Sequence, residues 1–254
     1  MLLAAIVLQA SVAPFSPPID APLRVVTERR EDDRLYRMER HLRFLREGEG
    51  YRAEVTLRTA TGDTGDVSGA LYEAGFGALA GQMLVFHLDR SGAVTAIDDM
   101  PALWERFCQR AAESAAERRS LAPPERQKLA ARIATPLRAL PPERQRAMLA
   151  SFALAVIADE AMTPGTMPVR LPGRAIHGGA TPLDGTRTVA ALPGGRLRST
   201  TSAAAEGVTL DRVTEVDPRT GLVTRASKTL RIRAGGLEKV SVTLLTVDPI
   251  AETR

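Results

Sequence analysis

The feature that most constrains the fold is a helical block, Pro101 to Ala158, that lies between two stretches of strand-like sequence. These stretches run from Pro22 to Asp98 and from Met167 to Val247, and turn-forming residues divide each of them into short segments. Because strands flank the helices on both sides, the chain predicts one α+β domain with an antiparallel sheet. We place its strands at 22–98 and 165–248 and its helical insertion at 99–160.

The N-terminus, MLLAAIVLQASVA, is an uncharged apolar segment that runs into the proline-rich stretch PFSPPIDAP. It is shorter than the about 20 residues that span a bilayer. Its length and the small residues Ser11 and Ala13 predict a signal peptide at 1–13, followed by a linker at 14–21. The alternative is a buried N-terminal strand, since no basic residue precedes the apolar run and Pro14 would follow the cleavage site. We predict a periplasmic or secreted bacterial protein.

The composition predicts a protein that relies on a buried core and does not bind nucleic acid. Cys108 is the single cysteine, so no internal disulfide can form, and 44% hydrophobic residues can supply a core. The net charge of +4 rests on 34 basic residues of which three are lysines, a bias typical of a GC-rich genome. Aromatic residues make up 4%, and basic residues alternate with acids, as in RMERHLRFLREGE. Neither property suits a base-stacking surface.

Several segments alternate between apolar and polar residues, which predicts half-buried antiparallel strands. In LYRMERHLRF the apolar face holds Tyr36, Met38, Leu42 and Phe44, and GEGYRAEVTLRTATGD continues the pattern after a loop at 46–50. The clearest hairpin is GVTLDRVTEVDPRTGLVTRASKTLRIR, whose turn contains Asp217, Pro218 and Gly221. Further turns are expected at 89–92 and at 194–195, and a last strand at 237–247.

The helical block contains a short repeat, because Pro-Pro-Glu-Arg-Gln occurs at 123–127 and again at 141–145. Proline suits the first turn of a helix and glutamate complements the helix dipole there, so the repeat predicts two helix starts. Before the repeat, apolar residues at helical spacing begin at Trp104 and predict a helix. Asp98 or Asp99 can be the N-cap of that helix. After the repeat, MLASFALAVIA predicts a helix that is buried against the sheet.

The chain contains no recognised catalytic, phosphate-binding or dinucleotide-binding motif. Its histidines, His41, His87 and His177, are far apart in the sequence, and the Asp-rich segments 63–66 and 98–99 lack the ligand number of a calcium loop. Cys108 lies on an apolar helix stripe, which favours a buried inert thiol over a nucleophile. We therefore predict no enzyme, no cofactor and no metal. A hydrolase whose residues carry no local motif stays open as an alternative.

The short apolar N-terminus, the run LDRSGAVTAIDDMPALWERF and the hairpin VDPRTGLVTRASKTLRI resemble a group of uncharacterised secreted bacterial β-sheet proteins with a helical insertion. More distantly, the chain is similar to the envelope lipoprotein-carrier half-barrels. The latter resemblance implies a sheet curled as a half-barrel, with a helix against its concave face and an apolar cavity between them. It places no ligand residue on this chain.

These observations predict a non-enzymatic envelope protein that binds a lipid or another apolar ligand in a half-barrel cavity. The candidate lining residues are Tyr36, Met38, Leu42, Phe44, Phe86 and Trp104. For each of them the alternative is a place in a dry core. A second hypothesis is an interaction scaffold that binds an envelope protein partner through an edge strand or through its arginine-rich face.

Overall fold

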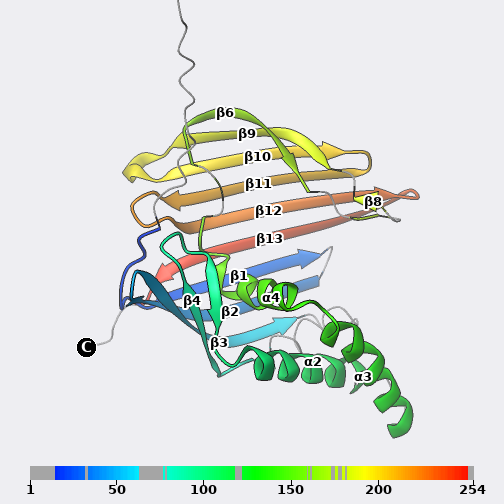
Figure 1. Cartoon of the computed structure of the whole chain (residues 1–254). Helices are drawn as coiled ribbons and strands as arrows, with labels where there is room; N and C mark the ends of the chain where they lie inside the picture. Colours follow the sequence, from blue (N-terminus) through cyan, green and yellow to red (C-terminus); the bar gives the residue numbers. More distant parts are fainter. Residues whose placement is uncertain are drawn as a thin grey trace, which may run out of the picture.

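The computed structural model is built around one eleven-stranded antiparallel sheet (Figure 1). It describes residues 15–250, apart from 32–33, 63–76, 78, 118–121, 159, 161, 173–174, 177–178 and 181. The predicted signal peptide and His177 lie outside the described residues, as does most of the glycine-rich segment 68–81.

The sheet has an N-terminal half and a C-terminal half. The N-terminal half consists of β1 (Leu23–Glu31), β2 (Arg34–Glu47), β3 (Gly50–Gly62), β4 (Met83–Leu88) and β5 (Val94–Ile97). The C-terminal half consists of β6 (Gly165–Leu171), β9 (Leu183–Ala191), β10 (Leu197–Ala205), β11 (Val208–Asp217), β12 (Leu222–Ala234) and β13 (Leu237–Pro249). A separate two-stranded sheet pairs β7 (Ala175–Ile176) with β8 (Gly179–Ala180).

The strand order is β5-β4-β3-β2-β1-β13-β12-β11-β10-β9-β6. The two halves are joined where β1 pairs with β13, with Leu23 opposite Pro249 and Glu31 opposite Ser241. The prolines and glycines around β6 predict a short or edge strand, and β6 is indeed one edge of the sheet. The other edge is β5, so the sheet remains open.

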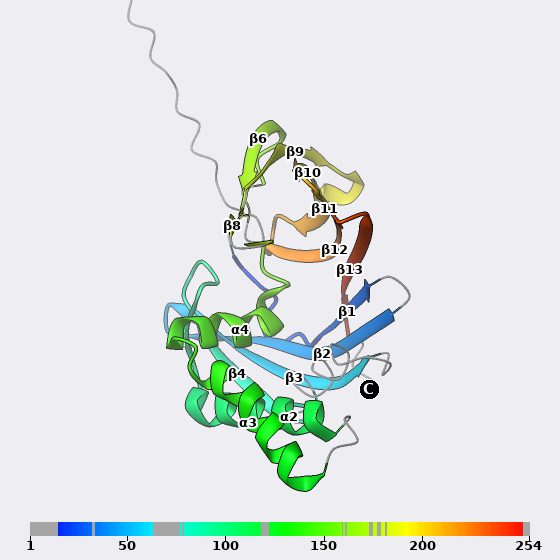
Figure 2. The same cartoon turned by 90° about the vertical axis from the view of Figure 1, so that its right-hand side faces the viewer.

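The α+β fold with a curled antiparallel sheet and a helical insertion is confirmed. The helices α2 (Met100–Glu117), α3 (Pro123–Arg138) and α4 (Pro142–Leu154) lie beside the N-terminal half in both views, while β6 and β9–β12 lie away from them (Figures 1 and 2). The curled sheet therefore has one half that is covered by helices and one half that is not.

The two proline repeats begin helices, as predicted, because α3 starts at Pro123 and α4 at Pro142. The apolar run after the second repeat is helical only as far as Leu154, which corrects the prediction of one helix through Ala158. The backbone of residues 156–158 instead pairs with the start of β12. Val156 O accepts from Val223 N at 2.7 Å, and Ala158 N donates to Gly221 O at 3.0 Å. These bonds compete successfully with the last helical turn.

The predicted turns form with the expected residues. In the hairpin between β11 and β12, Gly221 has φ of 70° and its N–H donates to Asp217 O at 2.9 Å. The Asp217 carboxylate accepts from the backbone N–H of Arg219 at 3.0 Å. Glycine adopts this positive φ without steric cost, and aspartate stabilises the turn through its side chain.

The core lies mainly between the N-terminal half of the sheet and the helices, and it continues into the C-terminal half through Val189, Val216, Leu222, Val223 and Leu245. One apolar cluster unites Phe44 and Phe86 from the sheet with Trp104 and Leu149 from the helices. Phe15, within the predicted linker, packs edge-on against Phe44 with the ring centroids 5.6 Å apart. The predicted limits of linker and domain stay predictions.

Candidate functional site

A pocket of about 260 Å³ lies on the inner face of the sheet, where the two halves meet. We call it the inner pocket. One wall is the segment after α4, through Ala155 and Ile157, and the other wall is formed by strands β11, β12, β13 and β1. Its apolar lining residues are Ala155, Ile157, Val223, Ala226 and Leu245. Its polar lining residues are Thr27, Arg212, Thr214, Ser227, Lys228 and Thr243.

Strand register places most of these residues on the face that carries the core. Leu245 lies opposite both Thr27 and Ala226, and Thr27 lies opposite the buried Met38. Because successive side chains point to opposite faces of a sheet, residues in register share one face. The inner pocket is therefore an extension of the core surface into the half of the sheet that no helix covers.

A row of cations crosses the same inner face. Arg187 on β9 lies opposite Thr201 on β10, Thr201 lies opposite Arg212 on β11, and Arg212 lies opposite Lys228 on β12. We call Arg187, Arg212 and Lys228 the cationic row. Arg212 and Lys228 also line the inner pocket, so the row forms one border of the pocket.

The carboxylate of Glu160, in the segment between α4 and β6, contacts two members of this row. Its Oε1 atom lies 3.1 Å from Arg187 Nη2 and also forms an ion pair with Arg212 Nη2. The side chains of Glu160 and Arg187 are each 12% exposed, and that of Arg212 is 28% exposed. Partly buried ion pairs of this kind are screened less than surface pairs, and their desolvation offsets much of the attraction.

Several buried polar atoms beside this ion pair have no hydrogen-bond partner among the described residues. They are the hydroxyl oxygens of Ser199 and Thr201, the Nε atom of Arg187 and the Oε2 atom of Glu160. Ser199 and Thr201 are each only 2% exposed. Buried polar groups in native proteins are nearly always bonded to protein, water or a ligand. This place therefore has the capacity to bind a polar group.

The structure brings together five of the six predicted lining residues, but away from the inner pocket. Met38, Leu42, Phe44, Phe86 and Trp104 belong to the single apolar cluster under the helices, and Tyr36 is buried as well. None of the six is among the residues that line the inner pocket. The Trp104 indole N–H donates to Leu137 O at 3.2 Å, which joins α2 to α3.

Sequence reasoning missed the residues of the cationic row and Glu160. A signal was present, because Leu210, Arg212, Thr214 and Val216 alternate in one phase and Val216 is buried. A charged residue that alternates in step with buried apolar residues lies on the same face of the strand as they do, so the pattern places Arg212 on the inner face. The same signal was missed in β2, where Arg40 is 2% exposed and its guanidinium donates to Thr27 Oγ1 at 3.1 Å.

The other chemistry-bearing residues do not assemble a reactive site in the described part of the chain. Cys108 is fully buried, as predicted, and desolvation raises the pKa of its thiol. His87 bridges Glu47 and Asp98, with 2.8 Å between His87 Nε2 and Asp98 Oδ1. Among the described residues no group of His, Cys, Asp and Glu has the arrangement of a metal site. Asp63 and Asp66 lie outside the described residues.

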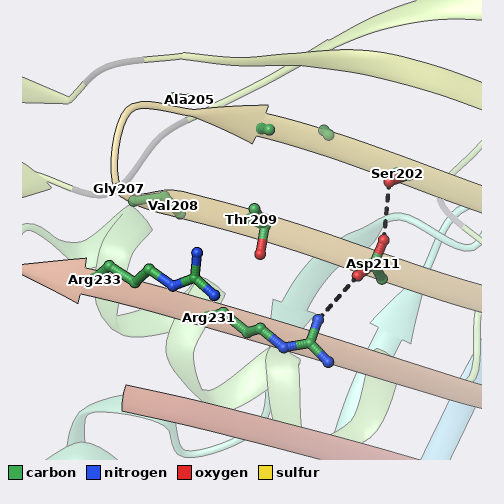
Figure 3. Close-up of a pocket in the computed structure, with 10 residues that line it drawn as sticks. Ser202, Ala205, Gly207, Val208, Thr209, Asp211, Arg231 and Arg233 are labelled. Carbon is green, nitrogen blue, oxygen red and sulfur yellow. Dashed lines mark hydrogen bonds and ion pairs between the residues drawn. The ribbon is translucent and has the colours of Figure 1, made fainter. Parts of the chain in front are cut away.

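A second, larger hollow of about 580 Å³ lies on the opposite face of β10, β11 and β12 (Figure 3). Asp211 lies between Ser202, whose hydroxyl donates to it at 2.9 Å, and Arg231, whose guanidinium is 3.3 Å away. Arg233 pairs with Glu238 at 3.0 Å. These charged side chains are exposed and already paired. The hollow therefore offers a ligand less than the inner pocket does.

Arginines on the outer face of the N-terminal half also pair with carboxylates. Arg24 and Glu39 form a two-pronged pair, with 2.7 Å between Arg24 Nη2 and Glu39 Oε2. The hydrogen bond from Arg24 holds the pKa of the Glu39 carboxyl below its usual value. Glu54 is bound in the same way by Arg43 and Arg52, each at 2.7 Å. These ion pairs are typical of a solvated sheet surface.

No protein-family model and no curated protein matches the chain. Among solved structures, one similar chain is titled "Lipid-protein interactions in lipovitellin", with 9% identity, a TM-score of 0.42 and 91% of this chain covered. This chain spans 24% of the length of that one. Another is a porin-like protein from Bacteroides uniformis, with 8% identity, a TM-score of 0.21, and 93% of this chain and 100% of that chain covered. Both likenesses are too remote to assign a function. Within the described residues, every helix is too short or too polar to cross a membrane.

Proposed function

We propose that this protein binds an apolar or lipid-like molecule in the inner pocket, as a non-enzymatic protein of the bacterial envelope. The observation that carries the proposal is a pocket with an apolar wall on the core face of the sheet, in the half that no helix covers. Binding pockets for small molecules are typically concave and mostly apolar, with a few polar groups that orient the ligand. The volume of about 260 Å³ suits one acyl chain or a molecule of similar size.

The apolar surface near the pocket continues along the inner face. Leu210 lies opposite Leu230, and Val208 lies opposite Ile232, and all four side chains are only half-buried. An extended chain that left the pocket across the cationic row would reach these residues. Burying such surface against a ligand contributes about 25 cal/mol per Å² of apolar area.

A neutral fluorescent probe, N-phenylnaphthylamine, tests the pocket directly. Ala226→Phe fills the pocket from β12, and Ala204→Phe makes the same change on the opposite face, in β10. We expect Ala226→Phe to weaken probe binding about tenfold or more, while Ala204→Phe leaves it unchanged. Ala155→Phe, on the other wall, repeats the test if Ala226→Phe does not fold. Equal binding by all variants, or no binding by the wild type, would contradict the proposal.

Native mass spectrometry of the protein isolated from periplasm or medium tests the remaining parts of the proposal. A mature mass that begins after residue 13 supports export. A mass excess that disappears on organic extraction supports an apolar ligand, whereas a co-purifying protein supports the alternative of an interaction scaffold. Turnover of ester or glycoside substrates by the purified protein would contradict a non-enzymatic role.

A further inference from the structure

We infer that the ligand is an amphiphile with an anionic head group, a carboxylate or a phosphate, which binds at the cationic row in competition with Glu160. This inference rests on the proposed function, because it adds the head group to a chain bound in the inner pocket. The inference is based on the positive charge of the cationic row, on the strand register that places the row beside the pocket, and on the buried polar atoms of the inner face without a hydrogen-bond partner among the described residues.

The first argument is the charge of the row. Arg212 and Lys228 lie directly opposite each other on neighbouring strands, and Arg187 is separated from Arg212 by one residue, Thr201. Like charges directly opposite each other in a sheet are destabilising. The row concentrates positive charge on the inner face, where the Glu160 carboxylate contacts both arginines.

The second argument is that only one of the two carboxylate oxygens of Glu160 contacts the arginines of the cationic row. Both arginines contact the same oxygen, Oε1, while Oε2 is buried without a hydrogen-bond partner among the described residues. A carboxylate bound by arginine commonly uses both of its oxygens. Glu160 therefore occupies an anion site that an acid with a better position or more oxygens can fill more completely.

The third argument is that unused polar atoms gather at the same place. Thr201 lies between Arg187 and Arg212, and its hydroxyl has no partner in the described part of the chain. The Nε atom of Arg187 is also buried without a partner there. A hydroxyl and a guanidinium N–H are both donors for an acid oxygen. Thr201 is only 2% exposed, so this hydroxyl belongs to a built site and not to a solvated surface.

The fourth argument connects the anion site to the inner pocket. Arg212 belongs to both, since it contacts Glu160 and lines the pocket. The segment that carries Glu160 also carries Ile157, which lines the opposite wall of the pocket. An acid group at the row thus has apolar surface within reach of its chain, and displacement of Glu160 releases the contact that holds this segment across the row.

The test compares probes that share a chain and differ in the head group. Dodecanoic acid, dodecyl phosphate and dodecanol compete with N-phenylnaphthylamine at neutral pH, and acetate and inorganic phosphate serve as head groups without a chain. We expect the two chain-bearing anions to bind the wild type about ten- to hundredfold more tightly than dodecanol. Equal affinities for the acid, the phosphate and the alcohol would overturn the inference while leaving the proposed function intact.

Two variants locate the head group. Glu160→Gln removes the competing charge, so we expect affinity for dodecanoic acid to rise about tenfold while affinity for dodecanol stays the same. Arg212→Gln, made in the Glu160→Gln background, is expected to abolish the preference for the acid. Arg231→Gln, on the opposite face of the neighbouring strand, is the matched control and is expected to keep that preference.

The remaining outcomes distinguish the proposed binding of an apolar molecule in the inner pocket from the inferred head-group site at the cationic row. If inorganic phosphate binds as tightly as dodecyl phosphate, the row is a site for a free anion and the inference of an amphiphile is wrong. If no chain-bearing probe binds, the proposed function fails together with the inference. If Glu160→Gln leaves the affinity for dodecanoic acid unchanged while Ala226→Phe abolishes binding, the pocket is correct and the head-group site is wrong.

Discussion

The inner faces of the two halves of the sheet follow the same alternating pattern but carry different side chains. In the N-terminal half this face holds Phe44, Val55 and Phe86, which pack under the helices. In the C-terminal half the equivalent face holds Thr201, Arg212 and Lys228 beside a pocket. The helical insertion supplies the second layer for one half only. The comparison shows that one face of a single sheet can be packed under helices at one end and carry polar and charged side chains beside a pocket at the other.

The largest expected difference between the halves is in stability. Phe44 is fully buried, so Phe44→Ala is expected to lower the free energy of unfolding by about 3–5 kcal/mol through lost contacts and a cavity. Leu230, on the inner face of the C-terminal half, is half-buried, and Leu230→Ala is expected to cost about 1 kcal/mol. Urea unfolding of both variants provides the measurement. Equal losses would show that the C-terminal half has a packed inner face as well.

Removal of the buried hydroxyl of Thr201 is expected to have an effect of intermediate size on stability. Valine has nearly the same shape, and a hydroxyl without a partner gains nothing from burial. We therefore expect Thr201→Val to raise the free energy of unfolding by about 1 kcal/mol and to weaken binding of dodecanoic acid. Such a trade between stability and function is common at binding sites. A variant that is both less stable and unchanged in binding would assign the hydroxyl a structural role.

The sequence was sufficient to predict the fold class because its signals are local. Alternation identified the face of Tyr36, Met38, Leu42 and Phe44, and turn residues such as Pro218 and Gly221 identified the hairpins. The repeated Pro-Pro-Glu-Arg-Gln identified two helix starts. Each of these signals acts over fewer than about ten residues of the chain.

The candidate site could not be predicted in the same way, because it depends on contacts between distant segments. The pocket exists where β1 meets β13, and that pairing joins Thr27 to Leu245 across most of the chain. Alternation shows that Arg212 shares a face with Val216, but it does not show that the helices stop short of that face. Nor does any local pattern place Glu160 against Arg187 and Arg212.

The smallest expected effect concerns the outer face, where both halves carry exposed ion pairs. Hydrogen bonds to Asp98 and Glu47 raise the pKa of His87 above its usual value near 6.5. A histidine whose pKa is higher in the folded state stabilises the fold fully below its unfolded pKa, and that contribution is lost as the pH rises through the folded pKa. Because the carboxylates are 42% and 58% exposed, we expect less than about 1 kcal/mol.

Urea unfolding of the wild type and of His87→Gln between about pH 5.5 and about pH 8.5 measures this contribution. The stability advantage of the wild type is expected to be largest at the acidic end and to shrink toward the alkaline end. Asp98→Asn removes the main cause of the raised pKa and is expected to flatten the profile. An advantage that grows with pH would contradict the assignment. A small effect here, beside a large one at Phe44, would place the main difference between the two halves on their inner faces.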